Sequence, residues 1–111
     1  RAPIPSESII TTVMVKHVVT FRFSGSTSER SAAASLFRDA LLALPAQIPE
    51  LKAIEVGINI NPAENYDLVL IAQAESLEEV AAYSAHPAHK AAVSLIADRI
   101  TSRACVDFIA G

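Results

Sequence analysis

Tryptophan is absent from the 111-residue sequence and aromatic residues make up only 5% of it, so small and aliphatic side chains must form most of the core. The single cysteine, Cys105, excludes an internal disulfide and a cysteine metal cluster, and it favours a reduced, cytoplasmic setting. The net charge of −3 gives no electrostatic footprint for nucleic acid or an anionic membrane. No apolar run is long enough to span a bilayer.

The composition is typical of one folded domain. A hydrophobic fraction of 51% and a charged fraction of 19% exclude intrinsic disorder, and the length corresponds to a single domain. Residues 1–13 contain no apolar segment followed by a small-residue cleavage site, so they are not predicted to be a signal peptide. We expect them to be a native extension, a leader or the remnant of a longer precursor, followed by a domain at residues 14–111.

The beginning of this domain predicts a strand and then a helix. Residues 14–23 alternate between two faces, and His17 lies on the more apolar one. Ser26 and Glu29 fit a capping box, which predicts the start of a helix that Pro45 ends. The buried stripe of this helix is expected at Ala33, Leu36, Phe37, Ala40, Leu41 and Leu44.

The remaining elements complete a recognisable order. Strands are predicted at 51–60, 66–74 and 104–109, and helices at 77–84 and 87–100. Ile60 is expected on the apolar face of the second strand. The order β-α-β-β-α-α-β predicts an α+β, ferredoxin-like fold, in which helices cover one face of a four-stranded antiparallel sheet.

The second face of that sheet is expected to be apolar and uncovered. Val18 lies on this face of the first strand, and the strand at 66–74 is apolar on both faces. A large exposed apolar surface usually marks an interaction site. We therefore predict a homodimer in which two sheets pair through these faces.

Most enzyme signatures are missing, including a glycine-rich phosphate loop, a serine nucleophile elbow and zinc-type histidine pairing. The polar residues that stand among apolar ones are His17, Tyr66, Tyr83, His86 and His89. His89 is the strongest functional candidate, because burial and a helix start both favour a neutral imidazole that exchanges protons near pH 7. We expect His17, Tyr83 and His89 to meet in one cavity between sheet and helices, and His86 to flank the last helix. The alternative is that each is a hydrogen-bonded core residue.

Six segments resemble, in order and spacing, the stress-responsive dimeric α/β-barrel domain family. They are MVKHVV at 14–19, LPAQIP at 44–49, IEVG at 54–57, YDLV at 66–69, HPAH at 86–89 and VDF at 106–108. The resemblance extends from Met14 to about Ile109. It implies a ferredoxin-like monomer whose sheet pairs with that of a second copy to close a barrel.

The family contains many stress-induced proteins and a plant polyketide cyclase that closes a ring without a cofactor. The resemblance implies that this cyclase's catalytic residues match His17, Tyr83 and His89, with His89 as the main catalytic group. A further histidine of the cyclase is replaced here by Leu68, which removes a polar group from the pocket. Substrate contacts are expected from Tyr66, Phe21 and Leu68.

Two functions follow as hypotheses. The first is a stress-related dimeric protein that binds a small hydrophobic ligand between sheet and helices. The second is a cofactor-free acid/base enzyme, similar to the cyclase, in which Tyr83 orients a carbonyl or aromatic substrate and His89 moves the proton. A cofactor-independent monooxygenase or a haem-handling enzyme is a further alternative by fold analogy. Some relatives hold a metal ion near the dimer interface, but no carboxylate cluster here specifies one, so we expect neither a metal nor a cofactor.

Overall fold

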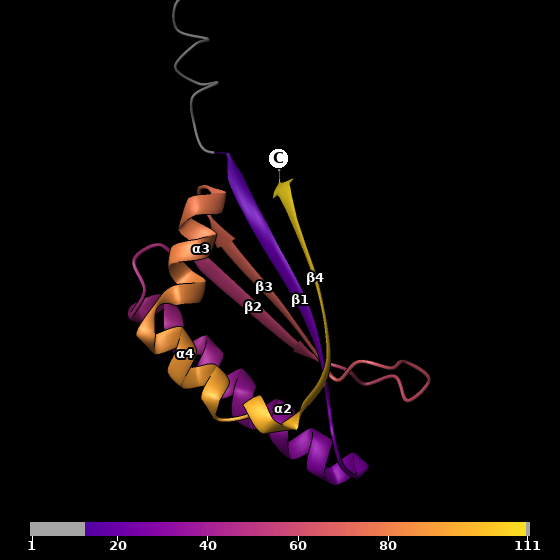
Figure 1. The fold of residues 1–111 in the computed structure, drawn as a ribbon. Coiled ribbons are helices and arrows are strands. Elements are labelled where there is room, and N and C mark those ends of the chain that lie inside the picture. The colour runs from indigo at the N-terminus through magenta and orange to yellow at the C-terminus, as the bar shows by residue number, and fades with distance from the viewer. Residues whose placement is uncertain (1–12, 111) are drawn as a thin grey trace, which may run out of the picture.

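The computed structural model describes residues 13–110, which form four strands and three α-helices. The strands are β1 (Met14–Phe23), β2 (Ala53–Ile58), β3 (Leu68–Ala74) and β4 (Ile100–Ala110). The helices are α2 (Thr27–Leu42), α3 (Leu77–Ala85) and α4 (Pro87–Ser94), with 3₁₀ turns η1 (Leu44–Ala46) and η2 (Ala97–Arg99). The sheet order is β2-β3-β1-β4, and every neighbouring pair is antiparallel. The helices lie on one face of this sheet (Figure 1), so the predicted ferredoxin-like fold is confirmed.

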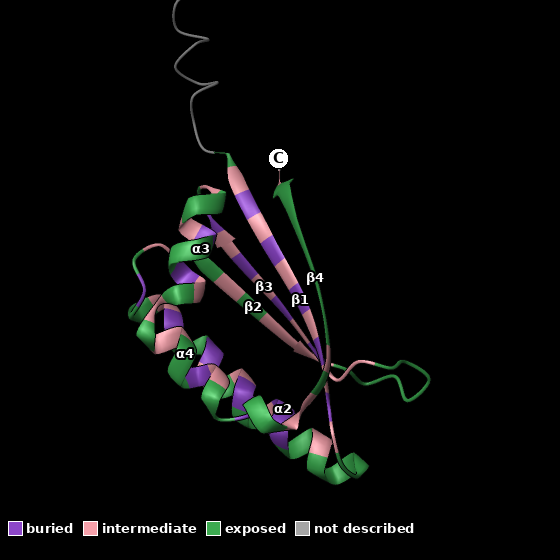
Figure 2. Cartoon of the chain, in the orientation of Figure 1, coloured by how far each residue is buried: buried purple, intermediate pink, exposed green. Residues whose placement is uncertain are grey.

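The core lies between the helices and the sheet face that they cover. Alternate residues of β1 and β3 are buried on this face, as the banded colouring in Figure 2 shows. Phe21 and Phe23 of β1 each meet the ring of Phe37 on α2 edge-on, with ring centroids 5.2 and 6.5 Å apart. Aromatic pairs favour this geometry. Three of the four phenylalanines are thus concentrated in one contact between β1 and α2.

The turn between β1 and α2 follows the predicted chemistry. Gly25 has a φ of 105°, a left-handed backbone conformation that residues other than glycine rarely adopt. The Ser26 hydroxyl accepts from the Glu29 amide, and the Glu29 carboxylate accepts from the Ser26 amide, which completes the capping box. One stripe position was wrong: Leu36 is 49% exposed, because the buried side of α2 passes through Ala34 instead.

Several boundaries differ from the predictions, and both middle strands begin two residues later than expected, β2 at Ala53 and β3 at Leu68. β2 ends at Ile58, and Ile60 is 95% exposed in the loop that follows. α4 ends at Ser94, six residues before the predicted end, and the 3₁₀ turn η2 comes next. β4 begins at Ile100 because this residue pairs with Phe23 of β1. The tertiary ladder with β1 therefore decides where the last helix gives way to the strand.

The sheet face opposite the helices is apolar at its centre. Val18 lies between Ile71 of β3 and Val106 of β4 on this face. Val106 and its neighbour on the same face, Phe108, are 63% and 46% exposed.

Among the described residues, no helix is long and apolar enough to cross a membrane. The expected extension at residues 1–13 lies outside the described residues, apart from the exposed Val13.

Candidate functional site

His17 occupies the helix-covered face of β1, beside the outer strand β4. The antiparallel register places it directly opposite Asp107 of β4. The imidazole is 7% exposed, and its Nδ1 lies 2.5 Å from Oδ1 of Asp107. A buried imidazole needs a partner for its ring nitrogen, and the carboxylate accepts the Nδ1 hydrogen. Asp107 therefore fixes the orientation of the His17 ring.

Tyr83 is the ring that neighbours both of the imidazoles predicted to meet. It projects from α3 and is 1% exposed, with its ring centroid 6.3 Å from His17 and 4.6 Å from His89. Its hydroxyl oxygen is buried and has no hydrogen-bond partner among residues 13–110. Burial raises the pKa of this phenol well above its usual range, so the group stays protonated at neutral pH.

His89 stands in the first turn of α4 and is half-buried. Its Nδ1 lies 3.0 Å from the carbonyl oxygen of Ser84. Since a carbonyl only accepts, Nδ1 carries the hydrogen, and a neutral ring then has a free acceptor at Nε2. Burial lowers the pKa of His89, and the positive charges of His17 and Arg103 lower it further, whereas the bond to Ser84 opposes the shift. The expected neutral histidine agrees with these contacts.

Cys105 joins this group from β4. It is opposite Val19 in the register, on the same face as Asp107, and its Sγ lies 3.5 Å from Nδ1 of His17. The distance from Sγ to Oδ1 of Asp107 is 3.8 Å. Partial burial and the Asp107 carboxylate raise the pKa of the thiol. His17, Cys105 and Asp107 are also the side chains here that could hold a metal ion.

Sequence analysis identified the histidines and Tyr83 but did not assign roles to Asp107 and Cys105. The positions of His17 and Asp107 differ by 90 in the chain, so no local motif joins them. The available signal was the alternation of β4, which places Arg103, Cys105 and Asp107 on one face of a strand. Only the register of β1 with β4 shows that this face of β4 is the one that carries His17 on β1.

The other predicted residues lie elsewhere. Phe21 and Leu68 are opposite each other on β1 and β3 and are buried in the main core. The Tyr66 hydroxyl lies 2.9 Å from Oγ of Ser102. His86 is the N-cap of α4, where Nδ1 accepts a hydrogen bond from the amide of Ala88. The structure thus brings His17, Tyr83 and His89 together and leaves Tyr66, Phe21 and Leu68 outside the group, where ligand contact stays a prediction.

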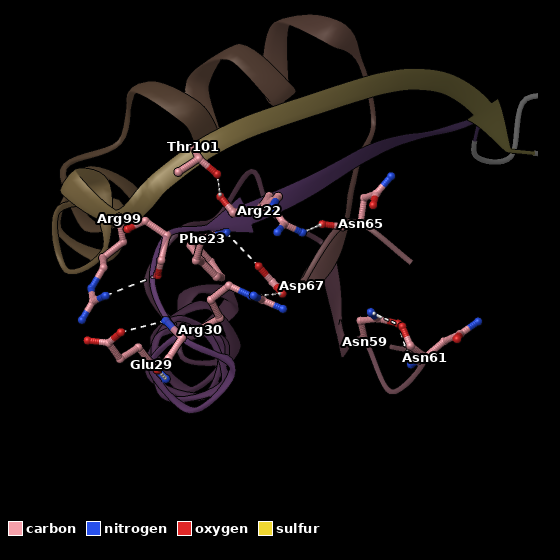
Figure 3. Close-up of polar contacts among 12 residues, drawn as sticks. Arg22, Phe23, Glu29, Arg30, Asn59, Asn61, Asn65, Asp67, Arg99 and Thr101 are labelled. Atoms are coloured by element: carbon pink, nitrogen blue, oxygen red, sulfur yellow. Dashed lines mark hydrogen bonds and ion pairs between the residues drawn. The ribbon is translucent and has the colours of Figure 1, made fainter. Parts of the chain in front are cut away.

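A second polar cluster lies at the opposite end of β1 (Figure 3). Asp67 accepts from the Phe23 amide at 2.8 Å and from Nε of Arg30 at 3.2 Å, which ties α2 to the sheet. Arg22 donates to the backbone oxygen of Asn65. A cleft of about 430 Å³ adjoins this cluster, lined by α2, the loop after β2 and Asp67. Arg30 and Asp67 form an ion pair, so the contacts of this cluster connect α2 and the loop before β3 to the sheet.

Comparisons with known proteins agree with this architecture. The stress-responsive A/B barrel domain family matches residues 15–110. A dimeric protein of unknown function with a ferredoxin-like fold from Bacteroides fragilis is 39% identical, with a TM-score of 0.82, and the match covers 86% of this chain and 94% of that one.

Two further solved structures extend the comparison. A dimeric ferredoxin-like protein of unknown function from Thermobifida fusca is 31% identical over 90% of this chain and 93% of its own, with a TM-score of 0.75. A protein of the same barrel family from Mesorhizobium loti is 18% identical over 90% and 99% of the two chains, with a TM-score of 0.70, and shows the fold alone. No curated protein matches significantly. With nearly its whole length matched, the chain belongs to the stress-responsive A/B barrel domain family.

Proposed function

We propose that the protein is a homodimer that binds a small aromatic or carbonyl compound against His17, Tyr83 and His89. The observation that carries this proposal is the Tyr83 hydroxyl, which is buried with no partner among the described residues, on a ring that neighbours both imidazoles. Leaving such a group unpaired costs about 1–3 kcal/mol, so a ligand oxygen that accepts its hydrogen would recover this energy.

The shape of the group favours an amphipathic ligand. Tyr83 is fully buried, whereas His89 is half-buried and the Asp107 side chain is 35% exposed, so the group extends from the core towards solvent. A carbonyl oxygen of the ligand would accept a hydrogen bond from the Tyr83 hydroxyl, and a phenol of the ligand would donate one to Nε2 of His89. These contacts do not require a charged ligand, and they do not require a cofactor.

The same contacts favour acid/base catalysis as a second candidate function. His89 has a lowered pKa and a free acceptor at Nε2, so it would accept a proton from a carbon next to a carbonyl. Tyr83, whose pKa is raised, would donate a hydrogen bond to the enolate oxygen that forms. Asp107 would hold His17 in one orientation beside them. This arrangement supports the cyclase-like hypothesis, with binding as its first step.

The homodimer rests on the open sheet face and on the relatives. The proteins from Bacteroides fragilis and Thermobifida fusca, which are more than 30% identical, are described as dimeric. In this chain Val18, Val106 and Phe108 form an apolar surface on the face away from the helices. Pairing two such faces would remove it from water. Sedimentation of the full chain as a stable monomer would overturn this part of the proposal. A cytoplasmic location stays a prediction.

Ligand binding is tested by calorimetric titration with 4-hydroxybenzaldehyde and 4-hydroxyacetophenone in the presence of EDTA. The parent chain should bind at least one of these probes, and His89→Ala should lose most of that affinity while its thermal midpoint stays close to that of the parent. His86→Ala is the matched control, because His86 caps α4 outside the group. A His89→Ala variant that is clearly destabilised but binds the probes as the parent does would assign His89 to the fold instead.

A further inference from the structure

The geometry points to a Zn²⁺ site formed by His17, Cys105 and Asp107. This site does not rest on the ligand binding proposed above, although both involve His17. The three side chains come from two neighbouring strands on one face of the sheet, with His17 opposite Asp107 and Cys105 two positions along β4. Their ligand atoms all lie within 4.8 Å of one another.

The distances between these atoms are close to those of a tetrahedral zinc centre. With Zn–S near 2.3 Å and Zn–N and Zn–O near 2.0–2.2 Å, tetrahedral angles place neighbouring ligand atoms about 3.3–3.7 Å apart. The Nδ1–Sγ distance is 3.5 Å and the Sγ–Oδ1 distance is 3.8 Å. The third distance, from Nδ1 to Oδ1, is 2.5 Å because a hydrogen bond joins these atoms. A cation would replace this hydrogen and increase the distance between Nδ1 and Oδ1 by about 1 Å. The exposed Asp107 side chain can make this movement by rotating.

The donor set also suits zinc chemically. Thiolate, imidazole and carboxylate are all zinc ligands, and a thiolate among them disfavours Mg²⁺ and Ca²⁺, which take oxygen ligands. Partial burial raises the pKa of Cys105, and the neighbouring Asp107 carboxylate raises it further, because two negative groups would lie side by side. A divalent cation would neutralise both charges. Arg103, also on β4, already favours the thiolate form.

Zinc binding at this site must displace protons. The Sγ proton of Cys105 leaves to solvent. In a neutral His17 ring the Nδ1 hydrogen also leaves to solvent and Nε2 takes up a proton in exchange, so that Nδ1 can bind the metal and the ring stays neutral. Three protein ligands leave a fourth position of the tetrahedron for water or another small ligand. The site is thus of the open kind rather than the closed structural kind.

The proposal is tested on the full chain after treatment with EDTA and its removal. Titration with Co²⁺ should produce the near-ultraviolet absorption of a thiolate–cobalt bond, and one equivalent of Zn²⁺ per chain should abolish it. Cys105→Ser should lack this absorption, and both Cys105→Ser and Asp107→Asn should bind Zn²⁺ at least about tenfold more weakly. Asp98→Asn, which removes an exposed carboxylate elsewhere, is the matched control and should bind as the parent does.

Two results would overturn the site. One is a parent chain that gives no thiolate–cobalt absorption, and the other is a Cys105→Ser variant with unchanged Zn²⁺ affinity. Because Cys105 is exposed, its replacement should leave the fold intact, which circular dichroism checks. The aromatic ligand titrations are made in EDTA, so failure of the zinc site and failure of ligand binding give separate results.

Discussion

The Tyr83→Phe substitution should stabilise the protein while it weakens ligand binding. Tyr83 is 1% exposed, and its hydroxyl has no partner among residues 13–110, so phenylalanine removes the unpaired group and keeps the ring. An unsatisfied buried hydroxyl costs about 1–3 kcal/mol, and we expect the free energy of unfolding to rise by at least about 1 kcal/mol. For a chain of this size that corresponds to a thermal midpoint about 4 °C higher.

Urea unfolding at a fixed chain concentration measures this change, and Tyr66→Phe supplies the matched control. The Tyr66 hydroxyl is hydrogen-bonded to Ser102, so its removal should lower the free energy of unfolding by about 0.5–1.5 kcal/mol. The same chemical change should therefore have opposite signs at the two positions. If Tyr83→Phe is destabilised as much as Tyr66→Phe, the Tyr83 hydroxyl is satisfied in the folded chain and the argument for a ligand contact fails.

Three other perturbations test the fold, the interface and the titration of the site. In urea unfolding, Asp67→Ala should lower the free energy of unfolding by about 1–3 kcal/mol, because it leaves the buried Phe23 amide unpaired. Asp39→Ala, which removes an exposed ion pair, should change this free energy by less than about 0.5 kcal/mol. Val18→Asp should convert the proposed dimer to monomer or aggregate, and analytical ultracentrifugation showing an unchanged dimer would exclude the open sheet face as the interface. His89 has a pKa below its unfolded value of about 6.5, so the unfolded chain binds more protons and stability should fall as pH drops through that value. His89→Gln should flatten this dependence of urea unfolding on pH, and an unchanged slope would contradict the assignment.

Local sequence patterns predicted the bounds of an element well where one hydrophobic period continues over its whole length. The bounds of β1 agree with the prediction because alternation continues over its whole length and Gly25 stops it. The α4–β4 boundary was missed because Ile96 and Ile100 also fit a helical stripe. Only pairing with Phe23 of β1 assigns Ile100 to a strand, and a tertiary contact of this kind has no local signature.

The site shows the same division. His17, Tyr83 and His89 were predicted to meet because each has an inward position on its own element, and the structure places the Tyr83 ring next to both imidazoles. Their roles stay predictions. Asp107 and Cys105 were given no role because their closeness to His17 depends on the register of two strands at opposite ends of the chain. A shift of one residue would turn both side chains to the other face.

The most direct test of the account is an NMR titration that follows the ring nitrogens of the histidines. The chain has three of them, His17, His86 and His89, so every signal can be assigned from single variants. Addition of 4-hydroxyacetophenone in EDTA should shift the His17 and His89 signals together and leave those of His86 unchanged, because His86 caps α4 outside the group. Saturating ligand that moves neither His17 nor His89, or moves only His86, would contradict the proposed pocket.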